Sequence, residues 1–536
     1  MERSVTTTAT KIAYKLATIC FVAGPLILAL YLLKYAVADF SSDAAMNSVL
    51  ARVMYDEGTV FPKDWIISNG EGPFPSTAMM IAPLLAYVSN GVLIPAIISV
   101  ILAALLIWSY WLFLSIFNRK PYLQALGFII LTMGFSYPFV RMVYVETAYF
   151  WWPFCFFICA FLTVKGFKTN NLKYFYLCAL VLFLFGLKNP QRVVIMITLP
   201  LLAFAGFLGS GSVRKILHSL RTKKIYLAYF GAMFISTAAS FGVTRWLAHV
   251  GFINDLAVVS SLHFANIDQI WSNTKIFVNG WFLYLGSDTE IYAYQSFEPF
   301  FRAFRSTFAV LVTIFAWLGV FTYIRSNQAE LRALAVSYLI SFFLIFILYI
   351  FTTSLAVNHL TMRYFTIPYL LALALAIIYA IEKFSSLTNF SLVVSIFVVI
   401  TTVSGYVRLI PCPAMDCNVR VSHVMAISDI LKKEGLKFGY ANWWAAGGPT
   451  IVSEEKVLIA PMNVSAAGIS PFAYMIDSKW YGLKIQNQEK FLMLFDHEAT
   501  PAVLAMLDKK YGSWKREIRS AGMVVLVFDP SVIFFN

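Results

Sequence analysis

The stretch Asp39-Phe40-Ser41-Ser42-Asp43-Ala44-Ala45-Met46-Asn47 decides how the rest of this chain is interpreted. It follows a long apolar run and opens a polar segment, residues 39–75, in which acids outnumber bases. The acids are Asp39, Asp43, Asp56, Glu57, Asp64 and Glu71, and the bases are Arg52 and Lys63. A carboxylate held at the end of an apolar run is costly unless it has a partner or a purpose. Asp43 is therefore the first candidate for a functional residue.

The composition predicts a polytopic membrane protein. Hydrophobic residues make up 60% of the chain and charged residues only 13%, against about 25% charged residues in soluble domains. The net charge of +14 does not indicate nucleic-acid binding, because Lys and Arg are scattered at the ends of apolar runs, where they orient spans and contact anionic headgroups. The first apolar run, 12–38, is longer than the apolar part of a signal peptide, so we expect a retained span.

Apolar runs of about 20 residues predict about eleven crossings. They lie at residues 12–38, 92–117, 121–140, 147–166, 174–188, 192–210, 225–247, 304–325, 331–354, 363–383 and 388–408. The apolar stretch 76–90 is short, and we expect a re-entrant or interfacial helix there. Counting it as a crossing would move the densest basic segment, residues 214–224, to the outer face, against the positive-inside rule.

This topology puts the N-terminus inside and the C-terminus outside. A transmembrane domain, residues 1–408, carries the first outer loop at 39–91 and a large outer loop at 248–303. Near residue 408 charges and turn residues return, and we predict that residues 409–536 form a small α/β domain outside the membrane. Its strands are expected near 438–441, 456–460 and 523–528, and its helices near 421–433 and 502–511.

Several common sites are missing from the sequence. It has no Walker loop, no GxGxxG after a strand, no HExxH and no paired CxxC. Its six His residues show no metal-ligand spacing, so no metal site is predicted. Cys412 and Cys417 flank a four-residue turn outside the membrane and are a candidate disulfide. Two free thiols remain the alternative, because spacing alone does not show a bridge.

Asp43 has two interpretations. It is a candidate catalytic base at the outer membrane face, or it caps a helix that begins at Ala44, since Asp is a favoured cap residue. Asp56, in Asp56-Glu57-Gly58, is a candidate substrate contact or a solvated charge at a helix end.

The outer ends of later spans supply cations. Lys188-Asn189-Pro190-Gln191-Arg192 places two cations and an amide between apolar spans, and Arg363 lies on the outer face, where the charge bias of loops does not call for it. Lys188, Gln191, Arg192 and Arg363 are candidates to hold a phosphate at the membrane interface, with Arg bidentate and Lys as a point charge. The alternative is snorkelling of these side chains to lipid headgroups.

Other polar and aromatic residues on the outer face are candidate substrate contacts, each with a structural alternative. Arg141 and Glu146 flank one turn and either contact substrate or pair with each other. His359 and Tyr364 border the span near 363–383. Trp443 and Trp444 suit stacking on sugar rings, or packing against the membrane half.

These motifs, taken together, resemble the GT-C superfamily of membrane glycosyltransferases, especially bacterial members that modify O-antigen and related surface glycans. The resemblance is carried by four segments in family order. They are Ser42-Asp43-Ala44 through Pro62-Lys63-Asp64-Trp65, Gly186 through Arg192 with Leu199-Pro200-Leu201, Arg363-Tyr364 with Ile367-Pro368, and Tyr440-Ala441-Asn442-Trp443-Trp444-Ala445 with Thr450 and Ser453.

The resemblance implies a bacterial inner-membrane enzyme with its active site facing the periplasm. It implies transfer of a hexose, with glucose favoured, from a polyprenyl phosphate sugar to an O-antigen, lipopolysaccharide or related envelope glycan, either a free or a lipid-linked glycan. The family's first-loop Asp, the base, corresponds to Asp43. Some members have a second acid beside it, but Ser42 stands there, so a second carboxylate comes from elsewhere or is absent. A divalent metal is therefore not supported, and no other cofactor is expected.

Two other functions fit part of the sequence. A flippase or transporter of lipid-linked saccharide would explain many spans and basic outer sites, but not the acidic first loop or the outer domain, and it usually shows mid-span charges and paired halves. An O-antigen ligase or polymerase uses a diphosphate donor and would favour long basic outer loops, whereas the loop 248–303 is mixed in charge.

Overall fold

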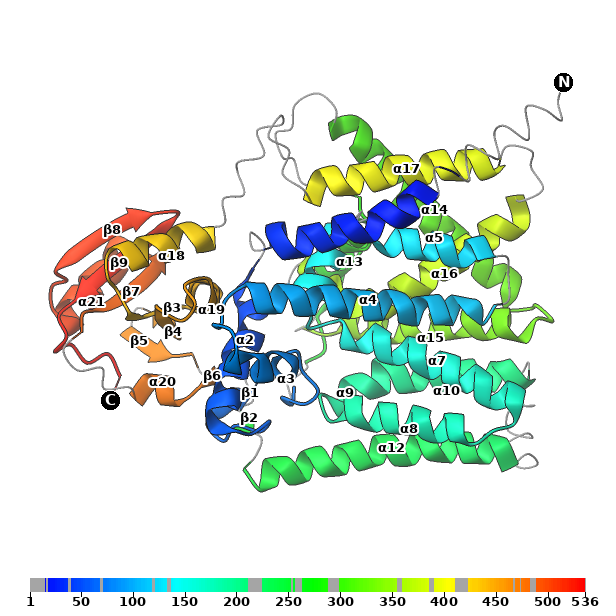
Figure 1. The fold of residues 1–536 in the computed structure, drawn as a ribbon, viewed down its shortest axis with the longest axis horizontal. Coiled ribbons are helices and arrows are strands. Elements are labelled where there is room, and N and C mark those ends of the chain that lie inside the picture. The colour runs from blue at the N-terminus through cyan, green and yellow to red at the C-terminus, as the bar shows by residue number, and fades with distance from the viewer. Residues whose placement is uncertain are drawn as a thin grey trace.

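The computed structural model describes most of the chain. The described residues are 15, 18–36, 40–67, 71–117, 121–132, 136–210, 224–251, 254–255, 263–287, 298–353, 359–384, 390–409, 423–465, 468–472, 474–482 and 488–535. Figure 1 shows two parts, a bundle of long, roughly parallel helices and a sheet-bearing unit at one end of it. The polar segment after the first helix lies at the junction of the two parts.

Seven helices of the described chain are long and apolar enough to cross a membrane. They are Thr18–Tyr35, α4 (Leu93–Ser115), Pro190–Leu208, α12 (Lys224–His249), Phe300–Tyr323 within α14 (Glu298–Tyr323), α15 (Ala329–Phe351) and Thr361–Phe384. The third contains α9 (Pro190–Val193), η5 (Val194–Thr198) and part of α10 (Leu199–Ser210), and the last contains α16 (Thr366–Phe384). The chain is thus a multi-pass membrane protein. The prediction of about eleven crossings is not confirmed by this set.

The remaining helices of the bundle are shorter or broken. α7 (Trp151–Thr169), α8 (Lys173–Gly186) and α17 (Phe390–Leu409) lie alongside the long helices (Figure 1). α5 (Pro121–Thr132) and the helix of α6 (Tyr137–Phe139) with η4 (Val140–Val145) differ in direction by 81°, so the predicted crossing at 121–140 is bent. The predicted outer loop 248–303 contains an 18-residue helix, α13 (Ile267–Tyr284).

The stretch 76–90 does not cross the bundle. It forms α3 (Ala78–Ile81) and η3 (Ala82–Ala86), and these nine residues are too few for the roughly 20 that a crossing needs. This agrees with the expectation of a re-entrant or interfacial helix. The helix α2 (Ser42–Glu57) lies before this stretch and ends at Gly58. Gly58 is its C-cap residue and has φ 63°, a conformation that glycine adopts without strain.

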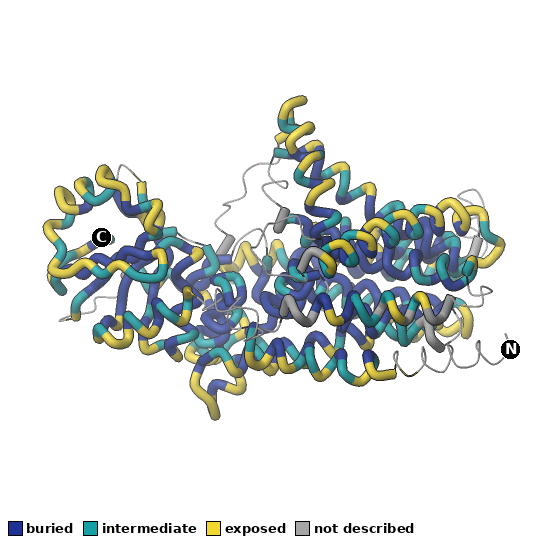
Figure 2. Tube along the Cα trace, turned by 90° about the horizontal axis from the view of Figure 1, so that it is seen from above, coloured by how far each residue is buried: buried dark blue, intermediate teal, exposed yellow. Residues whose placement is uncertain are grey.

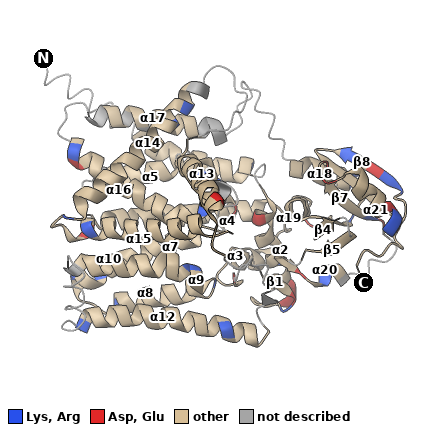
Figure 3. Cartoon of the chain, turned by 180° about the vertical axis from the view of Figure 1, so that it is seen from behind, with Lys and Arg blue, Asp and Glu red and all other residues tan. Residues whose placement is uncertain are grey.

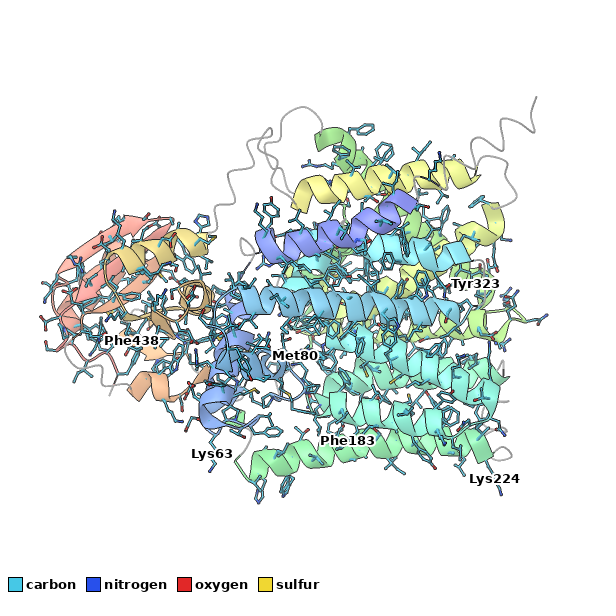
Figure 4. All side chains as sticks on the ribbon, viewed as in Figure 1. Lys63, Met80, Phe183, Lys224, Tyr323 and Phe438 are labelled. Atoms are coloured by element: carbon cyan, nitrogen blue, oxygen red, sulfur yellow. The ribbon has the colours of Figure 1, made fainter. Side chains whose placement is uncertain are left out.

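Burial and charge follow the two-part arrangement. Buried residues run through the centre of the bundle and of the sheet (Figure 2), and the α16 span is the most enclosed, with 83% of its apolar window buried. Charged side chains are sparse along the middle of the helices and gather at their ends and on the sheet-bearing unit (Figure 3). Figure 4 places Lys63 and Met80 near the junction and Lys224 and Tyr323 at the opposite end of the bundle.

The C-terminal residues form a six-stranded mixed sheet of order β5-β4-β3-β7-β9-β8. Its strands are β3 (Phe438–Asn442), β4 (Leu458–Ser465), β5 (Gly468–Pro471), β7 (Lys490–Phe495), β8 (Arg516–Ser520) and β9 (Met523–Phe528). β3 runs parallel to β4 and β7, and the other pairs are antiparallel. The strands expected near 438–441, 456–460 and 523–528 are present. The predicted domain boundary near residue 408 stays a prediction, because residues 410–422 and the candidate disulfide Cys412 and Cys417 lie outside the described residues.

Helices cover both faces of this sheet, because its central strands alternate buried apolar side chains between the two faces. Phe491 and Met493 join the core under α18 (His423–Lys433) and α19 (Trp443–Val452), and Leu492 and Leu494 join the core with α21 (Pro501–Tyr511). α20 (Lys479–Gly482) lies at the edge near the bundle (Figure 1). The helices expected near 421–433 and 502–511 match α18 and α21.

The two parts meet where α19 packs on α2. A Cβ on Gly447 would lie 2.4 Å from the Met46 Cε atom and 3.2 Å from the Ala45 Cβ atom, so a larger residue here would require the end of the Met46 side chain to move. The Gly447 N–H donates to Ser42 Oγ at 3.3 Å. The small residues of the opening stretch thus form the docking surface for the C-terminal unit, one turn from Asp43.

A three-stranded sheet ties three distant segments together at the same junction. Its order is β2 (Asn254–Asp255), β1 (Trp65–Ile67) and β6 (Ile476–Asp477). β1 comes from the first loop, β2 from the large loop and β6 from the C-terminal unit, and β1 is parallel to β2 and antiparallel to β6. The residues just before β6 are held over the end of the bundle as a result.

Candidate functional site

A polar cavity of about 60 Å³ lies at the junction of the two parts. It is lined by Asp43, Asn47, Glu71, Thr147, Ala148, Tyr149, Trp151, Lys188, Arg192, Arg363, Tyr474 and Met475. Four of the sequence-predicted site residues, Asp43, Lys188, Arg192 and Arg363, therefore share one cavity although they come from three separate segments.

Asp43 lies in the first turn of α2, whose N-cap is Ser41. Asp43 is therefore the second residue of the helix and not its N-cap, and the N-cap residue itself makes no side-chain cap hydrogen bond. Its Oδ2 atom lies 3.6 Å from Nη1 of Arg363. Burial raises the pKa of the Asp43 carboxyl, and the charges of Arg363 and Arg141 oppose this rise. A carboxyl held in this way can take up a proton from a substrate hydroxyl.

A second carboxylate stands beside Asp43. Glu146 follows η4, and its N–H donates to the Arg141 carbonyl at 2.8 Å, closing a π-helical turn. That turn brings the two side chains together, and Arg141 Nε lies 3.0 Å from Glu146 Oε1. Arg141 and Glu146 therefore form an ion pair, the predicted alternative to substrate contact. Burial and then the charge of Asp43 raise the pKa of Glu146 to about 7, against the pull of Arg141 and Arg363.

The next residue carries backbone strain. Thr147 has φ 55°, a region that β-branched residues rarely adopt. Its hydroxyl is held by the hydroxyl of Thr77 at 2.7 Å. Such strain costs of order 1–3 kcal/mol and gathers at functional sites. Here it turns the chain sharply between Glu146 and Tyr149, so that both face the cavity region.

Glu71 is a charged cavity residue that was not among the predicted site residues. It forms ion pairs with Arg192 and Lys188, the latter at 3.7 Å between Nζ and Oε2. Burial raises the pKa of Glu71, but the cations Arg192, Lys188 and Arg363 outweigh burial and lower it below its usual value. The next residue, Gly72, passes so close to Leu187 that a Cβ on Gly72 would lie 2.7 Å from the Leu187 carbonyl oxygen. This tertiary contact places Glu71 beside the cations.

The cationic side of the cavity is built on a helix start. Pro190 opens α9, and the Asn189 side chain accepts a hydrogen bond from the Arg192 N–H at 2.9 Å, as an N-cap does. This cap fixes Lys188 just before the helix and Arg192 in its first turn. Lys188 is almost fully buried, and burial lowers its pKa while Glu71 opposes that shift.

Two tyrosine rings connect the cations. The Cζ of Arg363 lies 5.1 Å from the centre of the Tyr149 ring, and the Cζ of Arg192 lies 5.9 Å from that ring and 5.5 Å from the ring of Tyr364. Guanidinium groups over aromatic faces gain cation–π stabilisation. The rings themselves meet edge-on at 5.7 Å. This stack fixes the two guanidinium groups without using all of their N–H donors.

The C-terminal unit covers the cavity through Tyr474 and Met475. The Tyr474 ring packs against the buried Trp443, with ring centres 4.8 Å apart. Trp443 is thus a packing residue in the junction. Trp444 beside it is 59% exposed and remains a candidate for stacking on a sugar.

Other predicted residues lie apart from the cavity lining. Asp56 is near the far end of α2 and faces Arg52 at 3.8 Å. Gln191 is exposed. The side chain of His359 lies outside the described residues.

The donor set of the cavity does not fit a divalent metal. Each of its carboxylates already faces a cation: Asp43 faces Arg363, Glu146 beside it faces Arg141, and Glu71 faces Arg192. Within the described ranges, no three His, Cys, Asp or Glu side chains are grouped so that they could hold a metal ion. We derive no step through a metal.

Three carboxylates and four cations converge here, so the site has an excess of positive charge. The carboxylates are Asp43, Glu71 and Glu146, and the cations are Arg141, Lys188, Arg192 and Arg363. The partial protonation of Glu146 near neutral pH increases that excess. The arrangement can bind an anion on the Lys188 and Arg192 side and accept a proton on the Asp43 side.

Three solved structures of an archaeal enzyme are among those similar to this chain. The crystal structure of the Archaeoglobus fulgidus oligosaccharyltransferase in complex with Zn and sulfate aligns with a TM-score of 0.50 and 11% identity, covering 95% of this chain and 73% of that one. The chain has the GT-C fold. The same enzyme tethered to an acceptor peptide and in its apo form aligns with TM-scores of 0.46 and 0.47, each at 11% identity, covering 94% and 91% of this chain and 73% and 71% of that one.

No family model and no curated protein sequence matches the chain. At 11% identity the likeness to the oligosaccharyltransferase concerns the GT-C fold alone. Substrate and reaction must therefore be argued from the cavity itself.

Proposed function

We propose that this GT-C protein is an inverting glycosyltransferase that uses a polyprenyl phosphate sugar as donor. The observation that supports the proposal is the single cavity lined by the Asp43 carboxylate and by Lys188, Arg192 and Arg363 at one end of the helix bundle. A hexose, with glucose favoured, would be moved to an O-antigen, lipopolysaccharide or related lipid-linked glycan. The site would face the periplasm of a bacterial inner membrane.

In the proposed reaction the acceptor hydroxyl oxygen bonds to the anomeric carbon as the bond from that carbon to the phosphate oxygen breaks. The hydroxyl proton passes to Asp43. The phosphate leaves on its lipid, and its charge is stabilised by preorganised cations. Attack from the face opposite the phosphate inverts the anomeric centre.

The cations are suited to a lipid phosphate. Lys188 offers a point charge, and Arg192 and Arg363 offer planar forks that match phosphate oxygens. The Nε of Arg363 has no hydrogen-bond partner among the described residues and is buried. A phosphate oxygen would satisfy this donor, whose desolvation otherwise costs about 1–3 kcal/mol.

The test is transfer in proteoliposomes with a panel of polyprenyl phosphate sugars and the matching polyprenyl diphosphate sugars. We expect transfer from one monophosphate sugar and its loss in the triple variant Lys188→Ala, Arg192→Ala, Arg363→Ala. Asp429→Asn, at an exposed position of α18, is the control and should retain transfer. Use of a diphosphate donor would indicate a ligase or polymerase instead. Movement of the intact lipid-linked saccharide across the bilayer, without transfer, would indicate a flippase.

A further inference from the structure

A second cavity, lined almost wholly by apolar side chains, lies between the first membrane helix, α4 and α5. Its volume is about 440 Å³, within the range of roughly 300–1,000 Å³ found for ligand pockets. Three rings form part of its wall: Phe21 stacks on Phe128 with centres 4.3 Å apart, and Trp111 meets Phe128 edge-on at 6.1 Å. The small side chains of Ala29 and Ala103 line the same space.

A smaller apolar cavity continues toward the polar site. It has a volume of about 30 Å³, shares Leu32 with the larger one, and is lined by Phe40 and Val145. We call the two cavities together the apolar track. From Phe21 to Leu32 a helix rises about 16 Å at 1.5 Å per residue, about half of the roughly 30 Å hydrocarbon thickness of a bilayer. The track therefore runs along most of the Thr18–Tyr35 span to the end of the bundle that carries the polar site.

The track ends beside an unsatisfied carboxylate. Phe40 and Val145 are the chain neighbours of Ser41 and Glu146, and Ser41 Oγ donates to Glu146 Oε1 at 3.2 Å. Oε2 of Glu146, a residue only 1% exposed, has no hydrogen-bond partner within the described residues. A buried acceptor left unpaired costs free energy, so this oxygen suits a donor that arrives with a ligand, such as a hydroxyl group.

The polar groups follow a fixed order from this end of the track. Glu146 comes first, then Asp43, which pairs with Arg363. Arg363 leads through the Tyr149 ring to Arg192. Arg141 pairs with Glu146 at this end, so Glu146 and Asp43 stand between the track and the cations Lys188 and Arg192, which a phosphate entering from the track would reach last.

This order matches what an inverting displacement needs, because the nucleophile and the leaving phosphate must lie on opposite sides of the anomeric carbon. Figure 1 shows the first helix, α4 and α5 on one side of the bundle and α8, α9 and α12 on the other. The cations Lys188 and Arg192 belong to the second side. The track thus opens onto the nucleophile side of the site.

We propose that the apolar track holds the hydrocarbon tail of a lipid-linked acceptor and brings an uncharged sugar hydroxyl to Asp43 and Glu146. This inference rests on the proposed glycosyltransferase function and narrows its acceptor to a glycolipid. The tail of the donor then lies on the other side of the bundle, near α8 and α12.

Photolabelling of the wild-type protein in proteoliposomes tests the occupant without catalysis. Two probes carry the same diazirine in the tail: a neutral alkyl glucoside and a polyprenyl phosphate glucose. We expect the neutral probe to label peptides from 18–36 and 93–115, and the phosphate probe to label other helices. Labelling of the track by the phosphate probe, or by neither probe, would overturn the inference.

Cavity-filling variants test its consequence. Ala29→Phe or Ala103→Phe should raise the KM for the alkyl glucoside roughly tenfold, with the KM for the donor and the slow hydrolysis of donor by water unchanged. Ala505→Phe, at an exposed position of α21 outside the bundle, is the control and should behave as wild type. An unchanged KM for the glucoside, or a raised KM for the donor, would contradict the inference. A wild-type protein that neither transfers nor hydrolyses donor would instead refute the proposed function, while photolabelling still reports on the track.

Discussion

The Arg363 guanidinium joins Asp43 to the cationic half of the cavity, with Nη1 3.6 Å from Oδ2 of Asp43. The same side chain lies over the Tyr149 ring, 5.1 Å from its centre. One cation therefore stabilises the ionised form of the candidate base and is also available to the leaving phosphate. Protonation of Asp43 and phosphate binding should influence each other as a result.

The pH dependence of transfer should respond to Glu146. Burial and the charge of Asp43 raise the pKa of Glu146 to about 7, and the interaction is mutual, so ionised Glu146 raises the pKa of Asp43. Glu146→Gln removes that charge, and we expect the acid limb of the pH–rate profile to move to lower pH. Initial rates from about pH 5 to about pH 9 measure this. An acid limb that stays in place would show that the two carboxyls titrate independently.

Glu146 also predicts how stability changes with pH. Its pKa in the folded protein, about 7, exceeds its usual value of 4.5, so the folded state binds the proton more tightly. The contribution of Glu146 to stability should therefore be largest below pH 4.5 and should be lost as pH rises to about 7. The slope should be at most about 1.4 kcal/mol per pH unit. Thermal unfolding in detergent at several pH values measures this slope. Glu146→Gln should flatten it, and a slope that persists in the variant would assign it to other groups.

Glu71 should compete with phosphate for the cations. It pairs with both Lys188 and Arg192, so Glu71→Gln leaves the cation pair with one charge less to neutralise it. We expect the variant to be less stable alone but to bind inorganic phosphate roughly tenfold more tightly. The shift of the thermal midpoint with phosphate concentration measures this affinity. Weaker phosphate binding in the variant would mean that Glu71 organises the cations and does not compete.

Gly72→Ala should disturb the same cluster through the backbone. Its Cβ would lie 2.7 Å from the Leu187 carbonyl oxygen, so Glu71 must move away from Lys188. We expect a loss of about 1–3 kcal/mol in stability and weaker donor binding. Gly231→Ala in α12, where a Cβ meets nothing within 4 Å, is the matched control and should be neutral or stabilising. Equal effects of the two substitutions would contradict this role of Gly72.

Substitution of the adjacent residues Trp443 and Trp444 should have different effects on stability and on acceptor binding. Trp443 is buried against Tyr474, and Trp443→Ala should cost about 3–5 kcal/mol in stability. Trp444 is exposed, so Trp444→Ala should change stability by no more than about 0.5 kcal/mol. If Trp444 stacks on a sugar, its variant raises the KM for acceptor while the melting temperature stays constant. An unchanged KM for acceptor would show that Trp444 does not contact the sugar.

Local patterns predicted much of the fold. Apolar runs located the long helices, and β-branched runs located β4 and β9. The predicted crossing at 121–140 contains an 81° change of direction between α5 and α6, which periodicity does not reveal. The helix α13 was missed because its polar positions resemble a mixed loop.

At the site, charge at the ends of apolar runs identified Asp43, Lys188, Arg192 and Arg363. It missed Glu71 and Tyr149, whose roles depend on tertiary contacts. Glu71 lies in a Gly- and Pro-rich segment, and only the approach of Gly72 to Leu187 places it between the cations. Tyr149 lies in an apolar run of the sequence, yet its ring lies under the guanidinium groups of both Arg363 and Arg192.

The most direct test of the central claim is single-turnover transfer by Asp43→Asn with the donor already bound. The Asn side chain keeps the shape of Asp but takes up no proton, so the account predicts a rate lowered by about 10²–10⁴-fold, with donor affinity close to wild type. Transfer at the wild-type rate in this variant, with donor bound to the same extent, would contradict it.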